Sequence, residues 1–322
     1  MDKMLNILKE TVARVLDDVD MVIGYKNGFD AIHATPHFIT STEEIDDLIW
    51  NPLCVHNLTT YLPTLKTTKT GIIVKGCDSR TIVQFMQEEL VPRDNLVIIG
   101  IPCRGVINVR KVLKEINDPA GFVEEVSFDN NGNISIKTNK VDKTLPIADF
   151  CPEKCRTCQY PTPLIYDYLV GDAIKSEKSV ESVYSDIKKF EGKTLEDRMK
   201  YWEGEFDRCI RCYACRNACP LCVCSDNCIA ESRDPHWMTQ KMIFTEKFMF
   251  HMIHALHLAG RCVECGECTR ACPMGIPVNK LKRKINLDMK ELYGYEPGVN
   301  PSEKPPMFMF NVDELTIKEH KI

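Results

Sequence analysis

Cysteines at a repeated spacing are the residues of this chain best suited to chemistry. The pattern C-x2-C-x2-C-x3-C-P occurs twice. The first run consists of Cys209, Cys212, Cys215 and Cys219, and the second consists of Cys262, Cys265, Cys268 and Cys272. In bacterial ferredoxins, three thiolates of one such run bind a 4Fe-4S cluster and the fourth thiolate binds the neighbouring cluster.

The doubled run therefore predicts two 4Fe-4S clusters with crossed ligand sets. The first set is Cys209, Cys212, Cys215 and Cys272, and the second set is Cys262, Cys265, Cys268 and Cys219. Paired zinc sites are the alternative. Zinc sites usually show two CxxC pairs, and a zinc ion has no use for a doubled run of four cysteines.

A third group of cysteines, Cys151, Cys155 and Cys158, lies within eight residues of one loop. A 4Fe-4S cluster bound by these three thiols needs a fourth ligand, and two cysteines earlier in the chain are candidates. Cys103 and Cys77 each follow a predicted buried strand, at the strand end where open α/β sheets form their ligand crevices. We predict a third 4Fe-4S site completed by Cys103, with Cys77 as the alternative ligand.

The remaining cysteines are less clearly assigned. Cys222, Cys224 and Cys228 follow the first run closely. They either bind a further cluster together with a distant cysteine such as Cys77 or Cys54, or shield the neighbouring cluster, and both interpretations stay open. Cys54 stands among apolar residues and is most simply a buried small side chain.

Strand and helix patterns indicate how these cysteines are positioned. Residues 71–75 and 95–101 are predicted buried strands, followed by helices over 81–90 and 106–116. Two successive strand-turn-helix units indicate parallel strands. Apolar runs around Asn130-Asn131-Gly132 indicate a β-hairpin. The predicted fold class is α+β: an N-terminal α/β domain with a hairpin and an iron–sulfur loop, and a mainly helical dicluster ferredoxin-like domain.

A predicted helix over residues 238–258 separates the two cysteine runs. Its stripe of Phe244, Phe248, Met252 and Leu256 is predicted to pack in the core. Three histidines of this helix lie off any single face, so we expect solvated or capping side chains rather than a metal site. They are His251, His254 and His257.

The distribution of cysteines and charges suggests four regions. Residues 1–170 form the first domain, 171–206 a charged, solvated helical connector, 207–295 the dicluster domain and 296–322 a tail. The tail carries Met307-Phe308-Met309-Phe310. Such an apolar stretch is predicted to pack on a partner or on the body of the protein.

Composition narrows the class of protein. The chain has 322 residues and 17 cysteines, an odd number, and it is long enough to bury a core without disulfides. No secretion signal is visible, so we expect a reducing cytoplasm, where clustered cysteines are metal ligands or catalytic groups. A net charge of -5 from interspersed signs indicates no nucleic-acid partner. No apolar stretch is long enough to span a membrane.

Two cysteine-containing segments resemble those of a known family. They are Gly100-Ile101-Pro102-Cys103-Arg104 and Cys151-Pro152-Glu153-Lys154-Cys155-Arg156-Thr157-Cys158. They look like the iron–sulfur signature of the beta subunit family of deazaflavin-dependent hydrogenases and formate dehydrogenases. The resemblance covers roughly residues 71–160. It implies that Cys103 shares a cluster with the three-cysteine loop, and that the protein passes electrons between flavin, clusters and a catalytic partner subunit.

The family typically binds FAD, but this chain shows no glycine-rich N-terminal segment that would cradle it. Arg80 and Arg104 are predicted beside helix N-termini, where they could hold an anionic phosphate of a flavin or nucleotide. Pairing with carboxylates or neutralising a cluster is the other interpretation of these arginines. FAD binding therefore stays open.

These features favour an iron–sulfur electron-transfer subunit of a multi-subunit anaerobic oxidoreductase, such as a formate dehydrogenase, hydrogenase or heterodisulfide-reductase-like complex. It would relay electrons through three or more 4Fe-4S clusters between a catalytic subunit and a ferredoxin or flavoprotein. No catalytic triad or Walker loop is present in the sequence, so substrate chemistry is expected on another chain. The alternative is an FAD-containing subunit that itself reduces a nicotinamide or deazaflavin coenzyme or ferredoxin.

Overall fold

The N-terminal half is built on a five-stranded sheet. The computed structural model describes residues 2–118, 122–224, 228–231 and 238–310. The strands are β1 (Met21–Asn27), β2 (Ala34–Ile39), β3 (Thr70–Val74), β4 (Leu96–Gly100) and β8 (Tyr168–Leu169), in the order β2-β1-β3-β4-β8. β1 and β2 are antiparallel, and the other neighbours are parallel. The predicted parallel pair, β3 and β4, is confirmed.

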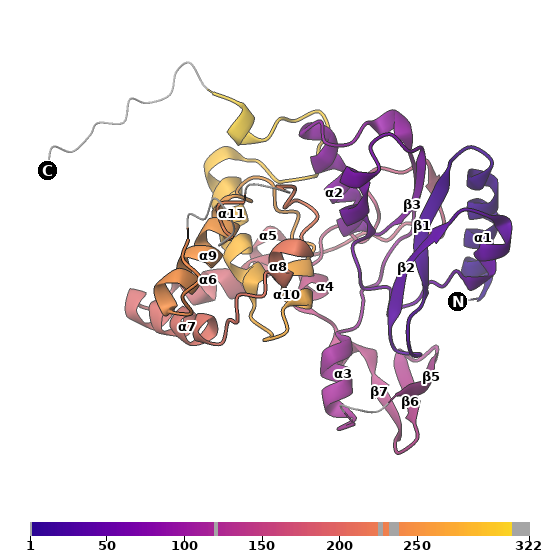
Figure 1. The fold of residues 1–322 in the computed structure, drawn as a ribbon, viewed down its shortest axis with the longest axis horizontal. Coiled ribbons are helices and arrows are strands. Elements are labelled where there is room, and N and C mark those ends of the chain that lie inside the picture. Colours follow the sequence, from indigo (N-terminus) through magenta and orange to yellow (C-terminus); the bar gives the residue numbers. More distant parts are fainter. Residues whose placement is uncertain (1, 119–121, 225–227, 232–237, 311–322) are drawn as a thin grey trace, which may run out of the picture.

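Helices cover both faces of this sheet (Figure 1). α1 (Asp2–Leu16) shares a buried core with Ile73, whereas α2 (Gly76–Gln87) shares a different core with Ile72. Successive side chains of a strand point to opposite faces, so Ile72 and Ile73 pack against the helices on opposite faces of the sheet. The arrangement places the start of α2 directly after the carboxyl end of β3.

A smaller antiparallel sheet forms a separate lobe together with α3 (Val109–Glu115) (Figure 1). Its strands are β5 (Val123–Phe128), β6 (Asn133–Thr138) and β7 (Asp142–Pro146), in that order. The predicted hairpin is confirmed, and Gly132 in its turn has a φ of +83°. A residue without a Cβ adopts this conformation readily. The α+β fold class is thus as predicted.

The C-terminal half is helical. The short helix α4 (Glu153–Arg156) lies in the three-cysteine loop. The further helices are α5 (Val180–Val183), α6 (Ser185–Glu191), α7 (Leu195–Asp207), α8 (Ala214–Asn217), α9 (Phe244–Leu256), α10 (Glu267–Ala271) and α11 (Val278–Tyr293). Among the residues with a described position, no helix combines the length and apolar character needed to cross a membrane.

The segment between the halves differs from the solvated connector that its charge predicts. α7 begins at the expected place, where the Thr194 side chain accepts a hydrogen bond from the Asp197 amide. Its Trp202 and Phe206 are buried in one core with Phe250 of α9. A few aromatic residues on one face are sufficient to dock the helix, although the segment is mostly charged.

Two helix boundaries near the cysteines also differ from the prediction. α2 begins at Gly76 instead of residue 81, because the Asp78 carboxylate accepts a hydrogen bond from the Lys75 amide and caps the first turn. Cys77 therefore lies within the helix. α3 begins at Val109 instead of residue 106, so Arg104 precedes the helix by a full turn.

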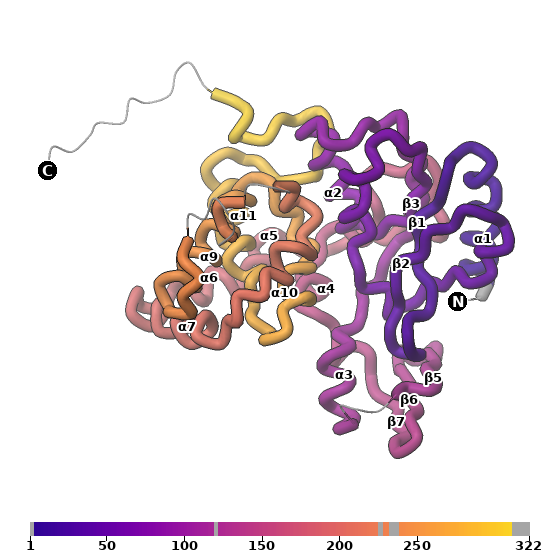
Figure 2. The backbone as a smooth tube through the Cα atoms, viewed as in Figure 1, coloured from indigo at the N-terminus to yellow at the C-terminus, as the bar shows by residue number. Residues whose placement is uncertain are grey.

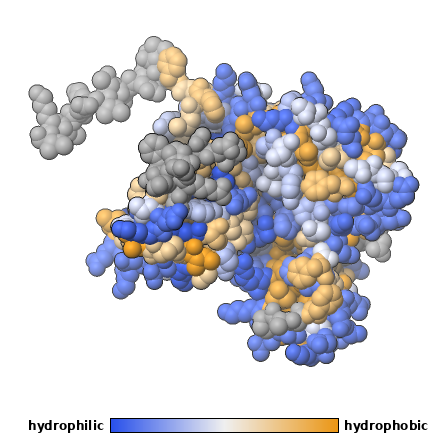
Figure 3. Space-filling model, in the orientation of Figure 1, coloured by the Kyte–Doolittle hydropathy of each residue, from blue (hydrophilic) through white to orange (hydrophobic). Residues whose placement is uncertain are grey.

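The C-terminal segment returns from the helical half to α2 (Figure 2). Gln87 of α2 donates to the Asn300 carbonyl at 2.8 Å, and Arg80 donates to the Pro297 carbonyl at 2.7 Å. Residues 307–310 are exposed beyond this contact, and Figure 3 shows apolar surface there. These four residues do not pack on the body, and a partner for them stays a prediction.

Position 76 requires glycine, because the start of α2 and the segment around Tyr160 approach each other closely there. A Cβ at this position would lie 1.7 Å from the Tyr160 carbonyl oxygen. Gly76→Ala should therefore push the cysteine loop away from α2 and lower the free energy of unfolding by about 1–3 kcal/mol. Gly204→Ala is the control, since its Cβ would meet nothing within 4 Å.

The control substitution, in the middle of α7, should raise stability by up to about 1 kcal/mol because alanine favours helix. Chemical unfolding under anaerobic conditions measures both variants. Equal midpoints for the two variants would contradict the close approach.

Candidate metal centres

The first crossed set of cysteines surrounds one small cavity. Cys209, Cys212, Cys215 and Cys272 all line it, together with Phe250 and His251. The first three come from one run and the fourth from the other, as the ferredoxin pattern requires. Backbone amides donate to the thiols, from Arg211 to Cys209 at 3.3 Å and from Ile276 to Cys272 at 3.4 Å.

The second crossed set lies deeper in the molecule. Cys262, Cys265 and Cys268 are buried, and burial raises the pKa of Cys265 to about 12. Cys219 interacts electrostatically with Cys265 and Cys268. The buried Lys282 interacts with Cys219, Cys262 and Cys268, and these thiols raise its pKa although burial opposes the shift. A cation thus lies beside three of the four thiols of the second set.

Both runs share an unusual backbone. The residue before the second cysteine of each run, Arg211 or Glu264, has a φ of +48° or +58°. The residue after that cysteine, Tyr213 or Gly266, has a φ of +59° or +71°. Alternating left- and right-handed residues turn successive amide groups to one side and form anion-binding concavities, which are known at iron–sulfur sites. The thiols and the backbone therefore both fit a 4Fe-4S cluster.

A larger cavity, of about 430 Å³, opens in the N-terminal half. Both candidates for the fourth ligand line it, together with two thiols of the loop: Cys77, Cys103, Cys155 and Cys158. Cys151 does not line the cavity. Its Sγ would lie 3.8 Å from a Cβ at Gly105, beside Cys155. The structure thus gathers all five cysteines and leaves the choice between Cys103 and Cys77 open.

Lysines around this cavity are functional candidates that the sequence patterns did not reveal. Five lining residues are cationic and two are acidic: Lys75, Arg104, Lys154, Lys175 and Lys178, with Glu177 and Glu264. The adjacency of a lysine to a cysteine in Lys75-Gly76-Cys77 and Lys154-Cys155 was the available signal. An excess of positive charge suits an anionic cluster or cofactor.

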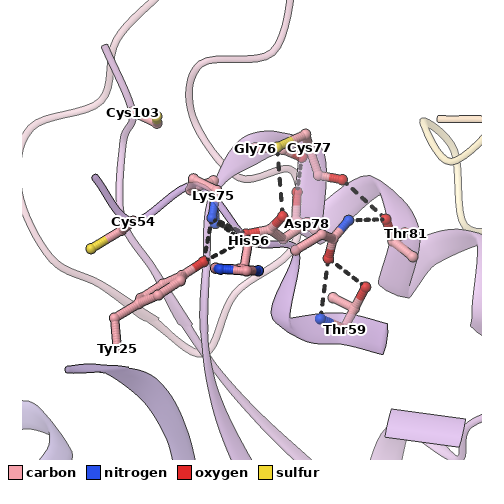
Figure 4. Close-up of polar contacts among 12 residues, drawn as sticks. Tyr25, Cys54, His56, Thr59, Lys75, Gly76, Cys77, Asp78, Thr81 and Cys103 are labelled. Carbon is pink, nitrogen blue, oxygen red and sulfur yellow. Dashed lines mark hydrogen bonds and ion pairs between the residues drawn. The ribbon is translucent and has the colours of Figure 1, made fainter. Parts of the chain in front are cut away.

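Lys75 is held in a network at the start of α2 (Figure 4). Its ammonium group donates to the Tyr25 hydroxyl and to the His56 carbonyl, and pairs with the Asp78 carboxylate at 2.9 Å. Burial alone would lower the pKa of Lys75, but Asp78 and Tyr25 raise it well above its usual value. Lys75 is therefore charged at the cavity wall. Cys77 lies beside it, and burial raises the pKa of that thiol.

The two arginines predicted at a phosphate site have different surroundings. Arg80 is buried and pairs with Glu296 at 3.6 Å, and its guanidinium lies over the Tyr160 ring. It holds the C-terminal segment and does not line the large cavity, and these contacts favour the interpretation as a carboxylate partner. Arg104 is exposed and lines the cavity, although it does not sit at a helix N-terminus.

The three cysteines after the first run are not brought together. Cys222 lies beside Cys219, Cys228 packs against the core that contains Cys209 and Cys215, and Cys224 is exposed. Residues 225–227 between them lie outside the described part of the chain. Cys54 is buried in the core, as predicted, and burial raises its pKa to about 12.

The prediction for the histidines of α9 was wrong for two of the three. His251 and His254 are buried, and only His257 is exposed, at the C-cap. His251 stacks on Phe206 and its Nε2 lies 3.4 Å from the Cys209 Sγ. The expected stripe also differs, since Leu256 is exposed. The face buried by packing against α7 and α11 is rotated from the one that the apolar spacing indicates.

Ion pairs join the cysteine loop of the N-terminal half to the second cysteine run. Lys154 lies 3.5 Å from Glu267 of α10. The buried Arg283 of α11 contacts Glu153 of α4 at 3.2 Å and Glu264 at 3.4 Å, and pairs with Asp186 through two nitrogens. The cavity of the N-terminal half and the second crossed set are therefore neighbours.

Comparison with known proteins identifies the class to which these sites belong. Residues 67–194 match the family model for the C terminus of the coenzyme F420 hydrogenase/dehydrogenase beta subunit, and residues 205–276 match the 4Fe-4S dicluster domain. One part of the chain thus matches the C terminus of that beta-subunit family and the next part matches the dicluster domain, and the resemblance drawn from the cysteine segments is confirmed.

Two curated relatives span almost the whole chain. The F420-dependent formate dehydrogenase subunit beta of Methanocaldococcus jannaschii is 26% identical over an alignment of 354 residues. The alignment covers 90% of this chain and 90% of the relative. The F420-dependent formate dehydrogenase 1 subunit beta of Methanococcus maripaludis is 26% identical over 347 residues, with 89% of this chain and 88% of the relative covered.

Among solved structures, a chain of the F420-reducing [NiFe] hydrogenase complex from Methanosarcina barkeri is similar with a TM-score of 0.38 and 14% identity. The match covers 50% of this chain and 63% of that chain.

The Arg283 network makes a prediction about stability. Arg283→Met leaves Asp186 and Glu264 without their shared cation in a largely dry environment, so the free energy of unfolding should fall by about 3–5 kcal/mol. Lys188→Met is the control, because Lys188 pairs with Glu291 at the exposed surface. That variant should change stability by about 1 kcal/mol or less. Similar losses in the two variants, measured by chemical unfolding, would contradict the role of Arg283.

Proposed function

We propose that this chain is the iron–sulfur electron-transfer subunit of a multi-subunit oxidoreductase. The observation that carries the proposal is the doubled cysteine run. Its two copies share one backbone conformation, the first crossed set lines one cavity, and further cysteines line a second, larger cavity. When bound, 4Fe-4S clusters supply one-electron transfer at potentials that the protein adjusts. The formate dehydrogenase relatives support a catalytic partner subunit that carries out the substrate chemistry.

Each set of cysteines is assigned to one cluster. Cys209, Cys212, Cys215 and Cys272 would hold the first cluster, and Cys262, Cys265, Cys268 and Cys219 the second. Cys151, Cys155 and Cys158 would hold a third cluster with Cys103, and Cys77 remains the alternative fourth ligand. Amide hydrogen bonds to sulfur and nearby cations raise the reduction potential of such a site, so Lys282 and Lys154 act as tuning residues.

Burial and contacts support an order of the three sites. Three thiols of the second set are buried, and the second run is joined to the cysteine loop through Lys154 and Glu267. The first set reaches the surface, where Cys212 is exposed. We therefore infer a relay that runs between the cavity of the N-terminal half and the surface around Cys212, with the second set in the middle.

A flavin-containing subunit is the second candidate, and the size and charge of the large cavity favour it. A space of about 430 Å³ falls in the range of small-molecule sites, about 300–1,000 Å³. Its cationic wall suits an anionic cofactor such as FAD or an anionic deazaflavin. The F420 dependence of the relatives supports a deazaflavin as the carrier that exchanges electrons with this subunit.

Metal analysis tests the number of clusters. The anaerobically reconstituted protein should contain about twelve iron and twelve acid-labile sulfide atoms per chain, for three 4Fe-4S clusters. Cys155→Ala should lose about four irons and keep the signals of the other two clusters. Cys54→Ala, which removes a buried thiol that belongs to no set, should keep them all. A wild-type content of about eight irons would exclude the third site, and zinc without sulfide would exclude the clusters.

Release of the cofactor separates the two candidate functions. Denaturation of the pure holo-protein should yield about one FAD per chain if the large cavity is a flavin site, and Arg104→Ala together with Lys178→Ala should weaken its retention. Chromatography and fluorescence of the supernatant measure it. A colour that comes from clusters alone, with no flavin released, leaves the pure electron-transfer function and contradicts the flavin candidate.

A further inference from the structure

A second thiol lies beside the fourth ligand of the second set. The ligand atoms of Cys219, Cys222 and His254 all lie within 4.8 Å of one another. Thiols that close together cannot easily bind two separate irons of one cluster, but either of them can approach the same iron.

The turn after the run explains the proximity. The Cys222 amide donates to the Cys219 carbonyl at 3.1 Å and closes a turn through Pro220. Leu221 is buried and anchors this turn in the core that also contains Cys262 and Cys265. The side chain of residue 222 is therefore held against the second set.

The other run contains the same turn without the second thiol. The Gly275 amide donates to the Cys272 carbonyl, also at 3.1 Å, through Pro273. Glycine occupies the position that corresponds to Cys222. Among the residues that the structure describes, the cysteines lining the first cavity are the four of the first set. The two runs thus share a turn, and the last residue of that turn carries a thiol only after the first run.

The surroundings of the two thiols are also alike. Both interact electrostatically with the buried Lys282, whose ammonium lies 3.2 Å from the His254 Nε2. Both thiols are half-buried and pack against the core around Cys262. Cys222 therefore has the chemistry and the surroundings of a ligand, although the ferredoxin pattern gives it no role.

We propose that Cys222 is an alternative fourth ligand of the second cluster and replaces Cys219 at the same iron. This inference rests on the proposed function, because it requires a 4Fe-4S cluster at the second set. In the exchange, the bond from iron to the Cys219 sulfur breaks and a bond to the Cys222 sulfur forms. The proton of the Cys222 thiol passes to Cys219, and the oxidation states of iron stay unchanged.

Paired cysteine variants of the full chain test the exchange. After anaerobic reconstitution, Cys219→Ala and Cys222→Ala should each keep the wild-type iron content, whereas the double variant should lose about four irons per chain. Cys272→Ala is the matched control. It removes the equivalent fourth ligand of the run without a second thiol, and it should lose about four irons by itself.

Spectroscopy and thiol labelling add readouts besides iron content. The electron paramagnetic resonance spectrum of the reduced second cluster should shift in Cys219→Ala, in which Cys222 is the ligand, and stay unchanged in Cys222→Ala. In the holo-protein, iodoacetamide should label Cys222 in the wild type and leave it protected in Cys219→Ala. The spectrum of the first cluster reports whether each variant is folded.

Two results would overturn the proposal. One is the loss of about four irons in Cys219→Ala, as in Cys272→Ala, while the spectrum of the first cluster persists. The other is an intact second cluster in the double variant, which would point to His254 as the replacement. A wild-type protein without iron and sulfide at the second set would instead refute the proposed function, so the two failures are distinguishable.

Discussion

The first cavity is lined by three thiols of one cysteine run and one thiol of the other, and this crossing constrains the C-terminal half. It requires α8 and α10 to lie side by side, because Cys272 follows α10 and completes a cavity whose other three thiols lie in α8 or directly before it. α9, which lies between the runs in sequence, must then pack outside the pair, where Phe250 and His251 close the first cavity. α11 follows the second run and brings Lys282 to the second set.

Charge balance is the second consequence of gathering thiols. An uncompensated cation or anion is costly to bury, so each buried lysine near the cysteines has a defined partner. Lys75 pairs with Asp78, Lys154 pairs with Glu267, and Lys282 lies among the second set itself. Each of these lysines therefore places a compensated positive charge beside a group of thiols. The pair of Lys154 and Glu267 also joins the two halves of the chain next to these thiols.

Local sequence patterns predicted much of this arrangement. Contacts between residues far apart in the sequence determine the features that were not predicted. The spacing of the runs indicated the crossed sets because the ligand geometry of a cluster is nearly the same in every ferredoxin. Short-range signals also predicted β3, β4 and the hairpin around Gly132. The contacts of Arg80 with Pro297 and Glu296 join residues more than 200 positions apart, and no local pattern marks them. The buried face of α9 was misjudged for the same reason, since α7 and α11 select it.

Corresponding positions of the two runs differ where their surroundings differ. Tyr213 and Gly266 have the same left-handed conformation, which favours glycine, yet only the second run has glycine there. A Cβ at Gly266 would lie 2.7 Å from the Lys154 side chain, so the second run can approach the cysteine loop only without a side chain. Tyr213 instead packs its ring against Phe250 of α9. The second run thus contacts the N-terminal half through Gly266, whereas the first run contacts α9 through Tyr213 and reaches the surface at Cys212. A relay between the large cavity and Cys212 requires the sites in this order.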